Sequence, residues 1–398
     1  MKRALTILLI LGVTFTNQWA CTSVLVSGQA TPDGRPILLK NRDTGALSNV
    51  IMEVQGDIYR YIGIVNAGDS LAKNVWGGFN ESGFAIINTA NYNLNSKSMK
   101  KENEGKIMAR ALAICASLKD FETLLDTLPR PLCVNTNFGV IDAQGGCAYY
   151  ETGHETYKKY DVNDPNVAPD GYLIRTNFGF SGNRSKDQGS ERYMAISSLM
   201  KEAHRKHRLD PVFLGTHVPR HLVHGMTRTC LTDKIPRSEK DTLMAPFRDY
   251  IPRYITASCM TVQGVKKGEP GHHAIAWTYV GHPLTTALLP IAIQVPGCLP
   301  QTFIPGQKGK AWMAEKGLEL KKRLFPYDVS NGHDYINVAQ LVNKKHTGIL
   351  QRVEMIEKDI ISRGCQLADS IHEGTLTPAQ LQEFYHWADR HLKAEFNF

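Results

Sequence analysis

The chain has 398 residues, 42% of them hydrophobic, which is enough to bury a substantial core in one large domain or two ordinary ones. Charged residues make up 21% of the chain and no low-complexity tract interrupts it, so wholesale disorder is excluded. The net charge is +8 at pH 7, but the basic residues are spread along the chain rather than gathered in a stripe with aromatic residues. We therefore expect no nucleic-acid partner.

Residues 1–20 are predicted to be a secretory signal peptide. A basic start precedes an apolar run from Ala4 to Val13, and that run is too short to span a bilayer comfortably. No later segment has about 18 consecutive apolar residues, so we expect no membrane span. The mature protein should be exported, either periplasmic or secreted, with a lipid anchor at Cys21 as the alternative. Gln18 at position −3 fits neither the signal peptidase pattern nor the lipoprotein pattern, which leaves the processing protease open.

The pattern of residues 21–300 predicts short strands and turns with a few helices. CTSVLVSG alternates and is β-branched, TPDGRP has turn chemistry and PILLKNRD resumes as a strand, which together predict a hairpin. NESG predicts a turn before the strand FAII, and DAQGG predicts a turn between GVID and CAYYE. Residues 106–128 have the apolar spacing of a helix with one buried face. This pattern favours an α+β fold over a doubly wound parallel sheet.

A Pro/Gly-rich segment near residue 300 is predicted to be a boundary. Residues 338–370 carry apolar side chains near helical spacing, and Gly374 can end that helix. TPAQ follows shortly after and supplies an N-cap, a first-turn proline and a capping partner for a second helix. We expect residues 301–398 to be a helical C-terminal extension without a catalytic constellation. Its default role is packing or dimerisation, and a homo-oligomer stays open.

Cys21 is the strongest candidate for a catalytic residue. Cleavage after Ala20 would make it the first residue of the mature chain, with its own α-amino group, of unperturbed pKa roughly 7.7–8.0, beside the thiol. That amine can take the thiol proton as the sulfur attacks a carbonyl, and later return it to the leaving nitrogen. The alternatives are a lipid anchor and a structural cysteine. A lipid anchor leaves the motifs LLKNRD, NESG and TNF unexplained.

Such a nucleophile needs a cation near the sulfur, a carboxylate to orient the amine and donors for the oxyanion. Lys40, Arg42 and Asp43 lie on the strand predicted to pair with the nucleophile strand. Asn88 and Asn177 follow strands or turns, and a side-chain amide donates without protonation. The structural alternatives are a salt bridge at the hairpin end for Asp43 and turn formation for the two asparagines.

These motifs resemble the N-terminal nucleophile hydrolases that use cysteine. CTSVLV with ATPDGR and KNRD resembles the family's start, NESGFAI its N-E-x-G signature, TNF its second asparagine motif and SERY its arginine segment. Three branches are similar: the penicillin V acylase and bile-salt hydrolase group, the secreted C69-type dipeptidases, and the isopenicillin-N acyltransferase and carcinine hydrolase group (peptidase family C45). The motifs occur in the family's order over residues 21–195, with weaker similarity to about residue 294.

The resemblance implies a role for each matching residue. Cys21 is implied to be the nucleophile and, through its amine, the base, and Asp43 to hold that amine. Asn177 matches the asparagine near the oxyanion or the α-amino group. Arg192 matches the late active-site arginine, with a surface ion pair as its alternative.

Two positions stay open. The family's early arginine falls on Lys40, with Arg42 two residues further on, so either can serve. The first oxyanion asparagine falls near Asn88, with Asn91 as the alternative.

The resemblance also implies a four-layer α/β/β/α sandwich of antiparallel sheets over residues 21–300. The reaction would be hydrolysis of a linear amide C–N bond in a small-molecule substrate, or transfer of its acyl group, through a Cys21 thioester. No metal or organic cofactor is implied, and the histidines of THVPRHLVHG are interrupted by Pro219 and lack an acidic neighbour.

The choice of substrate stays open. Penicillin V, conjugated bile acids, N-acyl amino acids, β-alanyl amines and dipeptides suit the same core. The ATPDGR opening with INTANY favours the isopenicillin-N acyltransferase and carcinine hydrolase branch, and a secreted dipeptidase is the alternative. A lipidated, non-catalytic surface protein is the alternative of another class.

Overall fold

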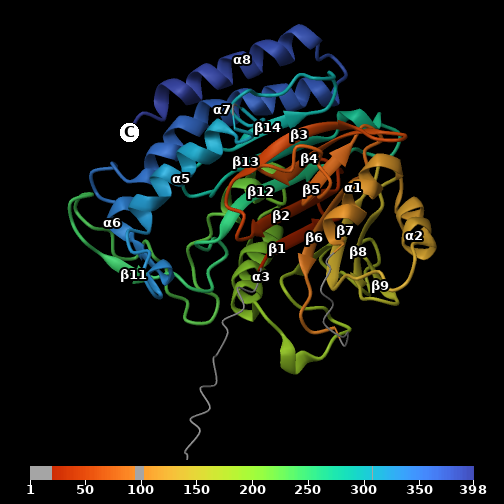
Figure 1. Ribbon diagram of the computed structural model, residues 1–398, viewed down its shortest axis with the longest axis horizontal. Coiled ribbons are helices and arrows are strands. Elements are labelled where there is room, and N and C mark those ends of the chain that lie inside the picture. Colours follow the sequence, from red (N-terminus) through yellow and green to blue (C-terminus); the bar gives the residue numbers. More distant parts are fainter. Residues whose placement is uncertain (1–19, 95–102, 307) are drawn as a thin grey trace, which may run out of the picture.

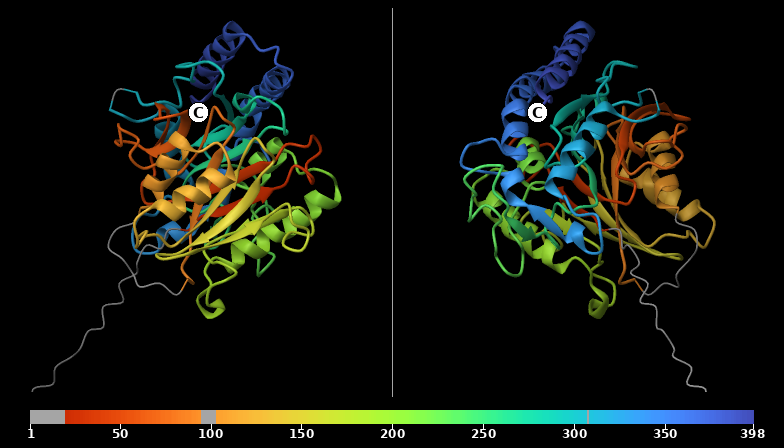
Figure 2. Two further views of the ribbon diagram at one scale, coloured as in Figure 1. Left: turned by 90° about the vertical axis from the view of Figure 1, so that its right-hand side faces the viewer. Right: turned by 60° about the vertical axis from the view of Figure 1, so that its left-hand side comes forward.

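The computed structural model describes residues 20–94, 103–306 and 308–398. Two antiparallel β-sheets pack against each other, and helices cover the outer face of each sheet, so this part of the chain has four layers (Figures 1 and 2). This is the α+β sandwich that the resemblance implied, and the predicted fold class is confirmed. No helix within the described ranges is both long enough and apolar enough to cross a membrane.

The first sheet contains the predicted hairpin as two of its interior strands, with Val24 opposite Leu39. Every neighbouring pair of its strands is antiparallel. In spatial order the strands are β10 (Tyr172–Arg175), β1 (Thr22–Val26), β2 (Ile37–Asp43), β12 (Thr256–Gln263), β13 (Ile275–Val280) and β14 (Leu289–Ala292).

The second sheet is a meander in which strands adjacent in the chain are adjacent in space. A hydrogen bond of 2.8 Å between the hydroxyls of Ser23 and Tyr149 joins the two sheets. The strands of the second sheet are β3 (Asn49–Gln55), β4 (Arg60–Asn66), β5 (Gly77–Asn80), β6 (Ala85–Ala90), β7 (Thr136–Ile141), β8 (Cys147–Thr152) and β9 (Tyr157–Asp161).

The NESG motif forms the predicted turn, between β5 and β6. Asn80 Oδ1 accepts hydrogen bonds from the backbone N–H of Ser82 and from its hydroxyl, at 3.1 and 2.6 Å. Its Nδ2 donates to the carbonyls of Leu112 and Cys115 at 2.9 and 2.8 Å. Gly83 has a φ of +85°, a conformation that glycine adopts without strain. The motif therefore shapes a turn and fastens the end of a helix, and none of these contacts involves Cys21.

Helices form the two outer layers. The first sheet is covered by α3 (Ser190–Arg205), α4 (Pro211–His217) and α7 (Ile349–His372), and the second by α1 (Glu104–Ile114) and α2 (Leu118–Thr127). The single helix predicted over 106–128 is thus two helices. The break occurs because Ser117 caps the second one, its hydroxyl accepting from the backbone N–H of Asp120 at 3.1 Å.

The C-terminal segment is helical, as predicted, and packs on the first sheet. It contains α5 (Trp312–Leu324), α6 (Val338–Leu341), α7 and α8 (Pro378–Glu395), with a small sheet of β11 (Met244–Pro246) and β15 (Tyr335–Asn337) beside α6. The predicted capping box at Thr377 is present, since Gln380 Oε1 accepts from its backbone N–H at 2.8 Å. In Figure 1, α7 and α8 lie side by side along this face.

Candidate active site

Cys21 directly precedes β1 and is 7% exposed. Ala20, 5% exposed, is still joined to it, so the nitrogen of Cys21 is an amide nitrogen in this structure. In the β1–β2 pairing, Thr22 lies opposite Asn41. The end of β2 therefore runs beside Cys21, whose Sγ lies 3.9 Å from the carbonyl oxygen of Asp43.

Side chains alternate between the two faces of β2, and this divides the candidate residues into two groups. Lys40 and Arg42 point toward the second sheet, where they bond Asn88 on β6 and Asn49 on β3. Asp43 points to the opposite face, toward the helices. Because β2 runs beside Cys21, one group surrounds the sulfur and the other surrounds the backbone of the same residue.

The group at the sulfur is built around two buried cations. Lys40 Nζ donates to Asn88 Oδ1 and to the carbonyl of Trp76, both at 2.6 Å. Arg42 Nη1 donates to Asn49 Oδ1 at 2.7 Å, and its guanidinium lies 4.7 Å from the ring centroid of Trp76. Burial lowers the pKa of Lys40 to about 7 and that of Arg42 to about 9, while a negative charge on Cys21 raises both. A thiolate on Cys21 would therefore stabilise the charged forms of both side chains.

Of the two asparagines left open, the structure brings Asn88 to Lys40. Asn88 Nδ2 also donates to Thr136 Oγ1 at 3.2 Å. The side chain of Asn91 instead donates to Asn137 Oδ1 at 2.8 Å. Asn88 is thus the asparagine that shares a cation with the sulfur side of the site.

Arg192 forms the centre of the group at the backbone of Cys21. Its side chain is 1% exposed, and Nη1 donates to the carbonyl oxygen of Cys21 at 2.6 Å and to Thr22 Oγ1 at 3.0 Å. Nη2 donates to Asn177 Oδ1 at 2.7 Å. Gly189, three residues before Arg192, has a φ of +78°, which favours glycine, and a Cβ there would displace the guanidinium of Arg192.

Asn177 follows β10 and is buried beneath this guanidinium. Its Oδ1 accepts from Arg192, and its Nδ2 donates to the carbonyl of Ala90 at 3.0 Å. The carbonyl oxygen of Cys21 and the amide of Asn177 are therefore held by one guanidinium.

Asp43 is 1% exposed and only half satisfied. Its Oδ1 accepts from Thr256 Oγ1 at 2.6 Å and from Asn41 Nδ2 at 3.3 Å. Its Oδ2 is buried, and no residue in the described ranges donates a hydrogen bond to it. Burial raises the pKa of Asp43 to about 6, against the lowering effect of the cations Arg253 and Arg192. A buried carboxylate oxygen without a donor can accept a new hydrogen bond.

Three residues near Asp43 were not predicted from the sequence: Thr256, Arg253 and Lys321. No local motif marks Thr256 or Arg253, because they meet Asp43 only through the pairing of β12 with β2. Lys321 did carry a signal, since a lysine at this position falls on the buried face of an amphipathic helix.

Three of the other cysteines, Cys115, Cys147 and Cys259, are buried. All eight cysteines are free thiols. Burial raises the pKa of Cys115 to about 12 and raises that of Cys147 and Cys259 as well. Such thiols stay protonated and are poor nucleophiles.

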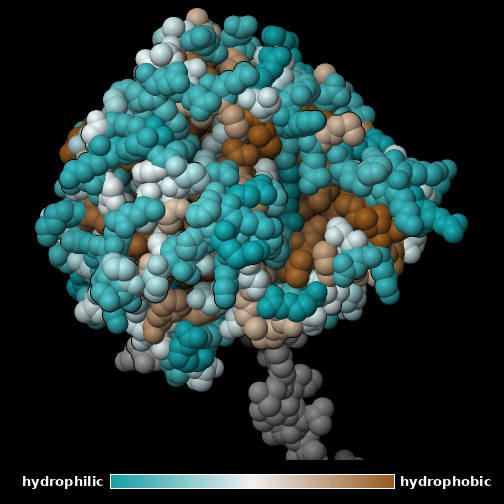
Figure 3. Space-filling view, turned by 180° about the vertical axis from the view of Figure 1, so that it is seen from behind, coloured by the Kyte–Doolittle hydropathy of each residue, from teal (hydrophilic) through white to brown (hydrophobic). Residues whose placement is uncertain are grey.

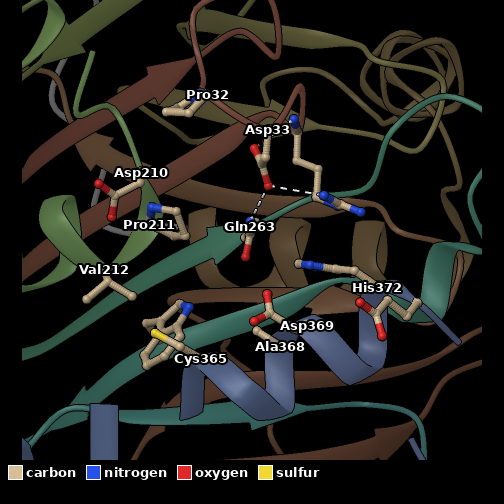
Figure 4. Close-up of a pocket in the computed structure, with 13 residues that line it drawn as sticks. Pro32, Asp33, Asp210, Pro211, Val212, Gln263, Cys365, Ala368, Asp369 and His372 are labelled. Carbon is tan, nitrogen blue, oxygen red and sulfur yellow. Dashed lines mark hydrogen bonds and ion pairs between the residues drawn. The ribbon is translucent and has the colours of Figure 1, made fainter. Parts of the chain in front are cut away.

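A cavity of about 360 Å³ lies at the other end of the β1–β2 hairpin (Figure 4). Asp33, in the turn of that hairpin, accepts from Gln263 at 2.7 Å and from Arg35 at 3.1 Å there. Because Cys21 begins β1 and Asp43 ends β2, this cavity is separated from the candidate site by the length of the strands. Seen from behind, the surface is largely polar, with apolar side chains gathered in hollows (Figure 3).

No protein family model and no curated protein matches this chain. Among solved structures, a conjugated bile acid hydrolase from Clostridium perfringens is 12% identical, with a TM-score of 0.40, covering 68% of this chain and 92% of its own. A penicillin V acylase from Agrobacterium tumefaciens is 12% identical, with a TM-score of 0.40, covering 69% and 86%. The Caenorhabditis elegans ortholog of N-acylethanolamine-hydrolyzing acid amidase is 18% identical, with a TM-score of 0.34, covering 48% and 87%.

The first two of these proteins are of kinds that the sequence motifs resemble. Two features of this chain agree with the N-terminal nucleophile hydrolase fold that the motifs implied: its four layers, and the position of Cys21 just before an interior strand of the first sheet. The chemistry proposed below rests on the contacts around Cys21.

Proposed function

We propose that this protein hydrolyses linear amide C–N bonds with Cys21 as the nucleophile, once the bond between Ala20 and Cys21 has been cut. One observation carries the proposal. Around Cys21 lie the carboxylate of Asp43, with one buried oxygen that has no donor in the described ranges, and the side chain of Arg192, which holds the carbonyl of Cys21. Lys40 and Arg42 lie on the side of the sulfur. A carboxylate and nearby cations are what an N-terminal thiol nucleophile requires.

Removal of the leader would supply the missing donor at Asp43. Residues 1–19 of the predicted signal peptide lie outside the described residues. An amide nitrogen offers one N–H, whereas a terminal ammonium offers three, and Asp43 Oδ2, which has no donor in the described ranges, can accept one of them. We propose that this segment also directs export, so that the mature protein is periplasmic or secreted.

In the proposed reaction, the α-amine of Cys21 takes the thiol proton while the sulfur attacks the substrate carbonyl carbon. A C–S bond forms, and the carbonyl electron pair moves to oxygen. Collapse of this intermediate breaks the C–N bond, and the ammonium returns the proton to the leaving nitrogen. Water then attacks the thioester by the same route, which releases the acid and restores the thiol.

The oxyanion can be held by a side-chain amide. Asn88 donates an N–H to Thr136 Oγ1, and Asn177 donates one to the carbonyl of Ala90. An amide has two N–H groups, so that of Asn88 can offer its second one to the substrate. Lys40 and Arg192 hold the oxygens of these amides and fix their orientation.

The substrate is proposed only as a class, a small molecule with a linear amide bond. An amine that reaches the thioester before water would make the reaction an acyl transfer. A secreted dipeptidase uses the same core and is the second candidate. A lipidated, non-catalytic surface protein would carry a diacylglyceryl group on Cys21 instead of a free amine.

Two measurements test the proposal. The mass of the mature N-terminus should correspond to an unmodified Cys21, and a diacylglyceryl adduct would support the surface protein instead. Cys21→Ser should abolish hydrolysis across a panel of amides without changing the far-ultraviolet circular dichroism. Cys365→Ser, at a thiol on α7, is the control and should keep wild-type turnover. Full residual activity in Cys21→Ser would end the proposal.

A further inference from the structure

A charged side chain from the C-terminal helices faces the same site. Lys321 lies on α5, and it is 3% exposed. No residue in the described ranges accepts a hydrogen bond from its Nζ, which is itself buried. Burying an ammonium without an acceptor is unfavourable, so its presence calls for a function rather than a packing role.

The segment before β12 links Lys321 to Asp43. Lys321 Nζ lies 3.8 Å from the ring centroid of Tyr254. Two residues further on, Thr256 pairs with Asp43 in the β12–β2 register and donates its hydroxyl hydrogen to Oδ1 at 2.6 Å. One short segment therefore contacts both residues, with Tyr254 at the ammonium of Lys321 and Thr256 at the carboxylate of Asp43. The negative charge of Asp43 also acts on Lys321.

We propose that Lys321 is a positioning residue that keeps the carboxylate of Asp43 ionised, so that this carboxylate can hold the α-ammonium of mature Cys21. The inference rests on the proposed function, because it assigns a role within that site. It makes the C-terminal helical segment part of the active site, in addition to its packing role.

Lys321 is one of the cations that favour the ionised form of Asp43, together with Arg253 and Arg192. Burial acts the other way and dominates, which raises the pKa of Asp43 to about 6. Arg192 on α3, Arg253 before β12 and Lys321 on α5 are the charged groups on the same side of the sheet as Asp43. Cys21 lies beside it before β1, and the charges of Lys40 and Arg42 act on it from the opposite face of β2.

Two histidines also face Lys321, and neither competes for its charge. Burial lowers the pKa of His282 to about 3, and burial also lowers that of His333; the positive charge of Lys321 lowers both further. The ring of His282 is therefore neutral over the pH range in which Asp43 titrates, and neither histidine carries a negative charge that could pair with Lys321. Asp43 is left as the charged partner of Lys321.

Lys321 is positively charged in the pH range in which Asp43 titrates. Burial lowers the pKa of Lys321 to about 7, so it is charged in the more acidic range where Asp43 takes up its proton. Removing this positive charge raises the pKa of Asp43. Activity that needs ionised Asp43 falls as pH drops through that pKa, so the acid limb of the rate profile moves to higher pH.

The first experiment compares pH profiles of kcat and kcat/KM for the mature protein and three variants on α5. Lys321→Met should move the acid limb upward by roughly one pH unit, with a larger loss at pH 5 than at pH 8. Lys321→Arg keeps the positive charge, so its acid limb should lie close to that of the wild type. Lys322→Met, at an exposed position, is the matched control and should not shift the acid limb. An acid limb in Lys321→Met that superimposes on wild type would overturn the inference.

Stability separates a positioning role from a structural one. A lysine whose pKa is lowered on folding costs stability below its unfolded pKa, and the cost is complete below its folded pKa. Lys321→Met should therefore not lower the Tm at pH 6, although activity at pH 5 falls. A lower Tm with a uniform activity loss at all pH values would make Lys321 merely structural and overturn the inference.

A second experiment measures the electrostatic coupling between Lys321 and Asp43 without an activity assay. The free energy of unfolding is measured against pH for the wild type and for Asp43→Asn, and the pH dependence of their difference reports the pKa of Asp43. The same pair is then measured in the Lys321→Met background. A higher pKa in the Lys321→Met background supports the coupling even if Cys21→Ser shows the proposed function to be wrong. An unchanged pKa overturns it whatever the enzyme assay shows.

Discussion

At the scale of single residues, the candidate site depends on a fork of hydrogen bonds from Arg192. One guanidinium nitrogen holds the carbonyl of Cys21 and the other holds the amide of Asn177. Arginine presents its donors in a rigid plane, so a single side chain fixes two groups relative to each other. A lysine in this place has one nitrogen and cannot reproduce both bonds.

We expect Arg192→Met to lower kcat of the mature enzyme by about 100-fold, because it releases Asn177 and the carbonyl of Cys21 together. Arg192→Lys should recover only part of the loss. The control is Arg205→Met, at the exposed end of the same helix, which should keep wild-type kinetics. Steady-state kinetics with any amide that the enzyme cleaves provides the measurement, and equal kcat values for the methionine variants would contradict the role.

At the scale of elements, a buried ion pair joins the C-terminal helix α7 to the turn after α4. Arg220 makes two hydrogen bonds to Glu357, and its other donors reach the carbonyls of Pro283 and Thr286 at 2.9 and 3.1 Å. Glu357 also accepts from the backbone N–H of Leu288 at 3.0 Å. Both charges are fully paired, which is the condition under which a buried ion pair persists.

Glu357→Ala should lower the free energy of unfolding by about 3–5 kcal/mol, because it leaves the guanidinium of Arg220 buried without its partner. The exposed Asp359→Asn on the same helix is the control and should change it by less than about 0.5 kcal/mol. The double variant Arg220→Met with Glu357→Leu should regain a large part of the loss. Urea unfolding measures all three, and a loss as small as the control's would show that the pair is not important.

At the scale of the whole molecule, the C-terminal helices are bound to the sandwich by buried polar contacts. Tyr385 on α8 accepts from the backbone N–H of Ala292 on β14 at 2.8 Å. Asp389 accepts from the backbone N–H groups of Gln301 and Thr302 at 2.8 and 2.9 Å. β14 is at the edge of its sheet, and an uncovered edge exposes unpaired backbone groups.

We expect residues 21–300 expressed alone to aggregate or to lose cooperative unfolding, because the outer face of the first sheet would be exposed. The full mature chain, residues 21–398, is the control. Solubility and thermal unfolding by circular dichroism measure the difference. A cooperative transition in the shorter chain would instead show that residues 301–398 form a separable extension.

Local sequence determined a specific part of this protein. The hairpin around Asp33, the NESG turn and the capping box at Thr377 depend on residues close together in the chain, so their chemistry is readable without a fold. The cysteine after the leader and the KNRD strand end were also readable, because a short hairpin brings them together. Even the break between α1 and α2 had a local cause, the cap at Ser117.

Tertiary structure decided the rest. Thr256 and Lys321 reach Asp43 from distant strands and helices, and only the pairing of β12 with β2 and the packing of α5 bring them there. The choice of Asn88 over Asn91 as the partner of Lys40 depends on how the two sheets face each other. The sequence gives the type of each side chain, but burial and the distances between charges arise only when the chain folds. These two quantities set the charge of Asp43.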